Sequence, residues 1–576
     1  MKKTTKKNIS RRKFITLAGG AASFAAISAM GMPLDWALNN PQIDVDSLDI
    51  DKISTDVLVI GGGMAGLFAA VKAHDAGANV LMVSKGRLGA SGQTPFAKGI
   101  FAYDPKNEKL SLDEFTDAVS RSALGTNNAT YTKQMAEHSL ARVNDLKEWG
   151  FFDSTLYNKS FSKPINDRNI PLQERIVITH LIKENNKIVG AAGFSTDQEK
   201  IIFYEAKSVI LCTGAGGFKP NGFPICDLTH DGTIMAYNIG AKVTGKEWND
   251  GHPGSSDNPA ACYDGWGDMF ERKPGTTGVE IHHDLGVDMN YIAYKNGNPL
   301  KMGPPGSGNQ NEVSGGPYVP EEFQRNNSEP PKREGRKSPK LEGGAPPGMS
   351  GTRVGGSSAG MSIHKAEGLV PINDKCESNI PGLYAAGDAL GSYMAGAIYT
   401  QVGSSLAGSA VQGGIAGEAA ANYSKKVETV HISTSKINEI QEEILAPLKR
   451  EAGYSPAWVT QTLQGIMIPN FIIYIKKGNL LNAALAYIEE LRDHHVPMLR
   501  AANMHELRLV HETANMITTA EMKLKASIMR TESRCSHYRL DYPELDNENW
   551  QAWINIFKGE DGTMQFEKQP FNSWPV

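Results

Sequence analysis

The chain has 576 residues, a mass of 62.4 kDa and a formal charge of −4 at neutral pH. Its first thirty residues hold seven cations and no acid, which leaves 52 basic and 63 acidic residues, or −11, in the remainder. An acidic body excludes a nucleic-acid partner, because phosphate binding needs clustered cations. The length exceeds what one hydrophobic core supports and predicts two or three domains. Five scattered cysteines without Cys-x-x-Cys argue against a disulfide framework, an attached haem or an iron–sulfur cluster on this chain.

Residues 1–31 predict a twin-arginine signal peptide. A basic start leads into SRRKFI at Ser10–Ile15, and a weakly apolar run follows to Gly31. Glycines interrupt this run, so it is too short for a permanent membrane span. Paired arginines ahead of such a run are typical of a leader that exports folded proteins. We therefore expect a periplasmic protein, or one on the extracytoplasmic cell surface; the alternative is a basic tail without an export role.

The segment directly after the leader predicts a dinucleotide-binding βαβ unit. A strand at 55–60 runs into GGGMAG at Gly61–Gly66, and a helix at 67–76 and a second strand at 79–83 follow. The first glycine permits the tight turn, the third lets the backbone approach a pyrophosphate, and the last allows close packing of helix and strand. The helix N-terminus offers N–H groups to the phosphates. Ser84 stands where an acid usually binds the ribose, so the choice between nicotinamide and flavin stays open at this point.

Further motifs lie later in the chain. They are a strand and glycine turn at 206–217, a helix start at 229–236, a strand ending in an acid at 380–388, and a helix start at 403–410. Together these motifs resemble the fumarate reductase/succinate dehydrogenase flavoprotein family, over most of 50–245 and 350–425. The segment Arg530–Pro543 also resembles this family, including its adenylylsulfate reductase flavoprotein branch. The resemblance implies that the cofactor is FAD.

The resemblance also assigns roles in the FAD site. It implies that Asp388 accepts a hydrogen bond from a ribitol hydroxyl, and that N–H groups at Ser405 and Leu406 face the flavin N1/O2 edge, where a helix dipole stabilises the reduced ring. Family members with covalent flavin carry a histidine in the loop after the second strand; 88–94 has none, so we expect non-covalent FAD and no metal. The cofactor-binding residues that we predict are Gly61, Gly63, Met64, Ala65, Gly66, Ser84, Lys85, Gly86, Ser91, Gly92, Thr213, Gly214, Asp231, Gly387, Asp388, Ser404, Ser405 and Leu406.

The resemblance implies an α/β fold in three parts. A Rossmann-like FAD-binding domain occupies 50–242 and 353–425. A capping and substrate domain is inserted at 243–352, of which 296–350 is rich in Gly, Pro, Asn and Ser. A C-terminal helical domain and tail fill 436–576, where apolar residues recur at helical spacing.

Reductases of this family deliver hydride from flavin N5 to a polarised double bond while an acid protonates the neighbouring carbon. Their clamp for two carboxylates is only partly present here. His252 and Pro253 are followed by glycine rather than threonine, Gly355 stands where we align a histidine, and Gln401 replaces an arginine. Losing a bidentate clamp argues against fumarate or succinate as substrate. We expect catalytic roles for His252, Arg353, Tyr399 and Gln401.

The sequence therefore predicts an exported FAD-dependent reductase that acts on an activated C=C bond of a small organic acceptor, as a terminal step of anaerobic respiration. Electrons would come from a separate cytochrome, quinol-linked protein or iron–sulfur subunit, which could also hold the enzyme at a membrane. Three alternatives stay open. They are a dehydrogenase running in reverse, an adenylylsulfate-reductase-like subunit of an iron–sulfur complex, and a flavin electron-transfer subunit without substrate chemistry.

Overall fold

The computed structural model describes residues 45, 48–96, 100–106, 110–153, 157–218, 228–249, 253–255, 353–355, 365–397, 403–468, 470–473 and 475–574. The predicted signal at 1–31, nearly all of the predicted cap, and the side chains of His252, Arg353, Tyr399 and Gln401 lie outside these residues. No helix within the described ranges combines the length and hydrophobicity that a bilayer crossing requires.

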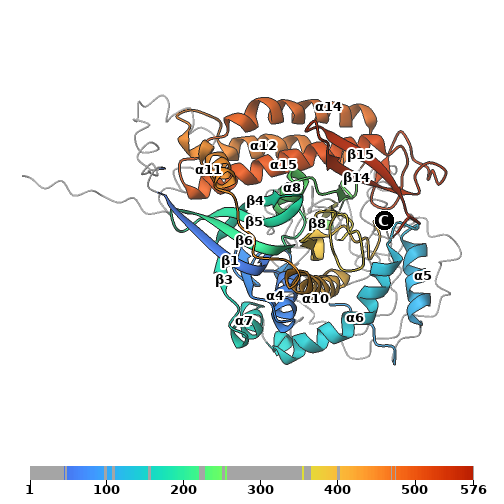
Figure 1. The fold of residues 1–576 in the computed structure, drawn as a ribbon. Helices are drawn as coiled ribbons and strands as arrows, with labels where there is room; N and C mark the ends of the chain where they lie inside the picture. Colours follow the sequence, from blue (N-terminus) through green and yellow to red (C-terminus); the bar gives the residue numbers. More distant parts are fainter. Residues whose placement is uncertain are drawn as a thin grey trace, which may run out of the picture. The chain divides into compact units, whose positions relative to one another are not determined.

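A seven-stranded sheet carries the βαβ unit (Figure 1). Its strands are β1 (Asp49–Ile60), β2 (Val80–Ser84), β3 (Leu172–Glu174), β4 (Ile176–Glu184), β5 (Lys187–Ser195), β6 (Lys200–Leu211) and β11 (Leu383–Ala385). The order is β3-β2-β1-β6-β5-β4, and β11 pairs with the end of β6. Because β2, β1, β6 and β11 pair in parallel, their carboxyl ends meet at one edge of the sheet.

Local sequence explains the predicted strands. Val57–Ile60 of β1 and Val209–Leu211 of β6 are buried, as expected for strands covered on both faces. The antiparallel hairpin of β4 and β5 turns at Asn185 and Asn186, which both have positive φ, a conformation that asparagine tolerates.

Two helices, one of them rich in glycine, lie side by side along the sheet (Figure 1). These are α4 (Met64–Asp75) and α10 (Ser404–Ser424). A Cβ on Gly413 would lie 2.2 Å from the Ala65 carbonyl oxygen, and one on Gly417 would lie 2.4 Å from that of Ala69. Only glycine permits so close an approach, so α10 brings its N-terminus to the same edge as α4. The neighbouring helices are α5 (Leu112–Ser122), α6 (Ala129–Glu148), α7 (Tyr157–Asp167) and α8 (Asp231–Asn238).

Helices dominate the C-terminal part, as expected, down to Met529. They are α11 (Thr434–Lys449), α12 (Pro456–Met467), α13 (Asn470–Ile473), α14 (Gly478–Glu490), a π-helical turn η8 (Leu491–His495) and α15 (Met504–Met529). Ile440 and Ile444 of α11 are buried, and so are Leu481 and Ile488 of α14, so both apolar stripes face the core.

The tail after α15 is not helical. It forms a hairpin of β14 (Ala552–Lys558) and β15 (Met564–Pro570), which joins β7 (Val243–Thr244) and β10 (Gly368–Leu369) in a second sheet of order β10-β7-β14-β15. The residues of β14 from Ala552 to Ile556 are all buried, so both faces of this strand are covered. Short pairs also form between β8 (Pro253–Ser255) and β9 (Arg353–Gly355), and between β12 (Ile475–Lys476) and β13 (Tyr538–Arg539). The tail therefore returns to the point where the predicted cap begins.

Candidate FAD-binding site

A pocket opens at the carboxyl edge of the main sheet and holds about 860 Å³ of space, part of it open to solvent. Thirteen of the eighteen predicted cofactor residues line it: Gly61, Gly63, Met64, Ala65, Ser84, Lys85, Gly86, Ser91, Gly92, Thr213, Gly214, Asp231 and Asp388. The structure thus brings together residues from four separate sequence motifs.

Five predicted residues do not line this pocket: Gly66, Gly387, Ser404, Ser405 and Leu406. A Cβ on Gly66 would lie 1.9 Å from the Gly61 carbonyl oxygen, so Gly66 serves the close packing of helix and strand. Gly387, with φ +69°, packs against Ala65. The three α10 residues form the first turn of that helix, beside Asp388 rather than on the pocket wall.

Sequence reasoning missed several lining residues: Ile60, Gly62, Gln93, Thr94, Ile176, Ile178, Cys212, Leu228, Met235, Ala386 and Ser409. Gly62 lies inside the glycine motif, and Thr94 belongs to a loop in which Ser91 and Gly92 are predicted. The neighbouring sequence could therefore have identified both residues as part of the site. Ile176 and Ile178 had none, because apolar residues of a strand give no sign of the ligand they will face.

The turn between β1 and α4 has the shape of an anion cradle. Gly61 has φ +124°, and a Cβ there would lie 2.1 Å from the Cys212 carbonyl oxygen. Gly63 is the N-cap of α4 and provides no side-chain cap, while the Met64 N–H donates to Thr94 Oγ1 at 3.1 Å. An uncapped helix N-terminus with backbone N–H groups at a pocket wall is a phosphate site.

A partly buried ion-pair network forms the end of the pocket at β2. Lys85 Nζ donates to Asp231 Oδ2 at 2.7 Å, to Thr229 Oγ1 at 3.0 Å and to Glu512 Oε1 at 2.9 Å. Burial alone would raise the pKa of Asp231. The charge of Lys85 and the hydrogen bonds that Asp231 accepts, including one from Asn515, outweigh burial, so the pKa of Asp231 is lowered. Asp231 therefore stays ionised, and α15 is tied to the pocket wall.

The opposite end of the pocket lies at β11. Asp388, in the short turn η7 (Gly387–Ala389) after that strand, pairs with the buried Lys365. Lys365 Nζ also donates to the Ser405 carbonyl oxygen at 3.1 Å and to Ser409 Oγ at 2.9 Å. No sequence motif pointed to Lys365.

These features fit FAD. From Ser84 at β2 to Asp388 at β11 the pocket crosses the ends of four adjacent strands, a span of about 14 Å at the usual strand spacing. The anion cradle lies between the two ends, at β1. A ligand with a central pyrophosphate and a polar group on either side matches this layout, with adenosine toward β2 and riboflavin toward β11.

The predicted catalytic residues remain predictions. Arg353 begins β9, and its backbone pairs with Ser255 of β8, a strand that starts directly after position 252. Backbone pairing thus brings Pro253–Ser255 beside Arg353–Gly355. Tyr399 and Gln401 lie outside the described residues.

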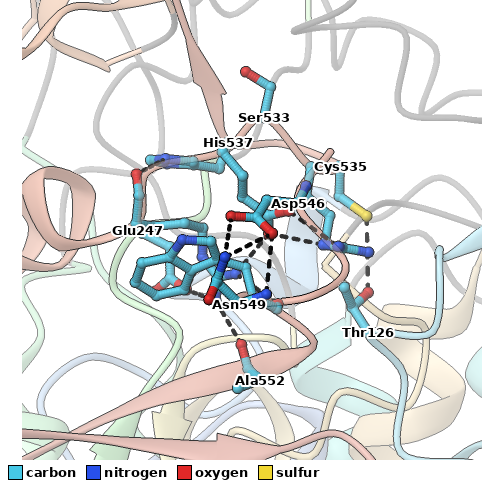
Figure 2. Close-up of polar contacts among 12 residues, drawn as sticks. Thr126, Glu247, Ser533, Cys535, His537, Asp546, Asn549 and Ala552 are labelled. Carbon is cyan, nitrogen blue, oxygen red and sulfur yellow. Dashed lines mark hydrogen bonds and ion pairs between the residues drawn. The ribbon is translucent and has the colours of Figure 1, made fainter. Parts of the chain in front are cut away.

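The C-terminal segment is anchored by buried ionic contacts near the start of the predicted cap (Figure 2). The guanidinium of Arg530 is fully buried, binds Glu247 Oε1 at 2.8 Å and Glu532 Oε1 at 2.8 Å, and stacks on Trp248 and Trp550. Arg534 pairs with the same Glu532 at 2.8 Å. Arg534 also donates to the Leu124 carbonyl oxygen at 3.1 Å, which ties the segment to the FAD-binding domain.

Two family models match this chain. An FAD binding domain matches 56–164, and the fumarate reductase flavoprotein C-terminal region matches 460–576. An uncharacterized FAD-dependent oxidoreductase of Methanocaldococcus jannaschii is 26% identical over 90% of this chain and 99% of its own length. One of the subunits of the fumarate reductase (CoM/CoB) of Methanothermobacter marburgensis is 24% identical over 88% of this chain and 98% of its own length.

Solved structures share the fold. Sdh1 of Mycobacterium smegmatis, in complex with UQ1, superposes with a TM-score of 0.70 at 21% identity, over 91% of this chain and 96% of that one. Adenylylsulfate reductase of Archaeoglobus fulgidus superposes with a TM-score of 0.65 at 18% identity, over 92% of this chain and 97% of that one. With the pocket, these matches define an FAD-dependent oxidoreductase and confirm the predicted cofactor and fold class. In its FAD-binding region and its C-terminal region the chain is similar to the fumarate reductase/succinate dehydrogenase flavoproteins.

Proposed function

We propose that this protein is an exported reductase that transfers hydride from the N5 atom of non-covalently bound FAD to an activated C=C bond of a small organic acceptor. The observation that carries the proposal is the relationship, over nearly the whole of both chains, to the fumarate reductase (CoM/CoB) protein of Methanothermobacter marburgensis. The departures at Gly355 and Gln401 from the dicarboxylate clamp favour an acceptor other than fumarate.

Bound FAD would supply the hydride chemistry, and the chain's own residues would hold it and the acceptor. The N-terminus of α4 binds the pyrophosphate, and Asp388 accepts from the ribitol chain. Arg353 and Tyr399 donate to the carbonyl that activates the double bond, or deliver the proton to carbon. His252 orients the acceptor or protonates it.

The test is reoxidation of the reduced protein. FAD is bleached anaerobically with a stoichiometric amount of dithionite, and the return of the flavin band at roughly 450 nm is followed after adding enoates or enones, fumarate included. We expect at least one unsaturated acceptor to restore the band, while its saturated counterpart does not. Arg353→Gln should slow that step by about 10²–10⁴-fold, the usual contribution of an acid catalyst. Arg168→Gln, which alters an exposed pair with Asp75, is the matched control.

The alternatives have their own outcomes. Bleaching of oxidised protein by a saturated acid would reverse the direction to a dehydrogenase. Bleaching by sulfite with AMP would favour adenylylsulfate reductase chemistry, an alternative that we test because the two proteins share a fold. Reoxidation by a partner protein alone would leave an electron-transfer subunit.

Export and the electron donor are separate parts of the proposal. The SRRKFI motif supports twin-arginine export. Arg11→Lys together with Arg12→Lys should therefore keep the full-length chain inside the cell, whereas the natural chain is recovered outside the cytoplasm with a shortened N-terminus. If both the variant and the natural chain are found in the cytoplasm, the export proposal is refuted. The electron donor should be a cytochrome, a quinol-linked protein or an iron–sulfur protein. When the reduced donor is mixed with the purified chain, it should reduce the bound flavin directly.

A further inference from the structure

Lys365 is a buried lysine whose contacts all converge on the riboflavin end of the FAD site. Its side chain is 1% exposed. The ammonium contacts Asp388 Oδ1, the Ser405 carbonyl oxygen at 3.1 Å and Ser409 Oγ at 2.9 Å. An ammonium has three donors, and these three acceptors use them all.

Two of these acceptors belong to the pocket itself. Asp388 and Ser409 line it, and Ser405 lies in the first turn of α10. Lys365 therefore links the end of β11 to the start of α10, the two elements that the FAD assignment places beside riboflavin. Its backbone has φ +63°, a left-handed conformation that is unfavourable for a lysine, so the surrounding structure imposes this placement.

The local electrostatics favour negative charge on a ligand. The N-cap of α10 is Gly403, which provides no side-chain cap, so the positive end of that helix dipole faces the same region. Burial lowers the pKa of Lys365, and the Asp388 carboxylate opposes this. Two-electron reduction of flavin with uptake of one proton adds one negative charge to the cofactor, so a nearby cation binds the reduced form better than the oxidised form.

We propose that Lys365 places a fixed positive charge at the riboflavin end of the FAD site, where it orients Asp388 and stabilises the reduced cofactor. Lys365 is in this sense a positioning residue that also sets the flavin potential. The inference rests on the FAD assignment and not on the identity of the acceptor.

The test measures the two-electron midpoint potential of bound FAD by equilibration with a reference dye, with dithionite as the reductant. Lys365→Met should weaken binding of reduced FAD about tenfold more than binding of oxidised FAD, which lowers the potential by about 30 mV. Asp388→Asn should shift it in the opposite direction, because the lysine charge is then unopposed. Lys365→Arg keeps the charge and should stay near the natural value.

Opposite signs for the two variants are the decisive result. A purely structural role predicts that both substitutions weaken FAD binding and shift the potential in the same direction or not at all, and either result would overturn the proposal. If Lys365→Met fails to fold, Asp388→Asn still tests it, since a lowered or unchanged potential in that variant contradicts it. The readouts are potential and FAD affinity, so they stand whether or not any enoate is reduced.

Discussion

The buried arginine Arg530 gives the sharpest test of how the C-terminal segment supports the site. We consider Arg530→Met, which keeps an unbranched apolar stem but removes the guanidinium and its charge. The guanidinium is fully buried, and so are the side chains of Glu247 and Glu532 that it pairs with. It also donates to the carbonyl oxygen of Ala552 at 2.7 Å, one of the residues labelled in Figure 2.

The expected cost follows from these contacts. Glu532 keeps its pair with Arg534, but Glu247 loses its ion pair and is left as a buried carboxylate with only the longer-range charges of Lys476 and Lys523. Removing one partner of a buried ion pair costs about 3–5 kcal/mol. Arg530→Lys should lose less stability than Arg530→Met but more than none, because an ammonium cannot donate to two carboxylates as the planar guanidinium does.

The assay is denaturant unfolding followed by tryptophan fluorescence, with FAD retention measured on the same samples. The matched control is Arg168→Met, which breaks an exposed, bidentate pair with Asp75 and should cost about 0–1 kcal/mol. Because Glu247 lies just before the segment of His252, Arg530→Met should also slow flavin reoxidation. If Arg530→Met is no less stable than Arg168→Met, the buried cluster does not hold this segment and the reasoning fails.

Two further predictions concern the glycine turn and a buried histidine. Gly61→Ala should abolish FAD binding, measured as flavin content after purification, because its Cβ would lie 2.1 Å from the Cys212 carbonyl oxygen at φ +124°. Burial lowers the pKa of the fully buried His537 well below its ordinary value, and Lys476 lowers it further. Near pH 6.5, therefore, only the unfolded chain protonates this histidine. The contribution of His537 to the free energy of unfolding is fully present above that pH, and it falls below that pH by up to about 1.4 kcal/mol per pH unit. His537→Gln should reduce this dependence in unfolding experiments at pH 5 and pH 7, while His230 and His511, whose pKa values burial also lowers, keep their share.

Each of these has a control. Gly77 also has positive φ, but a Cβ there meets nothing within 4 Å, so Gly77→Ala should cost about 1–2 kcal/mol of backbone strain and leave FAD bound. Equal loss of flavin in both glycine variants would contradict the steric argument. An unchanged pH dependence in His537→Gln would assign acid sensitivity to other groups.

Much of the cofactor site could be predicted because its signals are local. The turn at Gly61–Gly66 requires glycines at fixed spacing between a strand and a helix, so a short window of sequence determines it. The acid at Asp388 follows a buried strand in the same way. The C-terminal hairpin was missed because the apolar stripes of α11 and α14 set the expectation for the whole segment, and β14 gains its partner β7 from some 300 residues earlier.

The sequence by itself determined the class of fold and the glycine turn, since strand, turn and helix signals act over a few residues, and its resemblance to a known family supplied the cofactor. Only the tertiary structure decided how the charges pair. Lys365 meets Asp388, Lys85 meets Glu512 and Arg530 meets Glu247, across up to 427 positions of chain. A lysine in a sequence looks like any solvated cation. Its burial, and the acid that compensates it, arise only when distant segments pack together and exclude water.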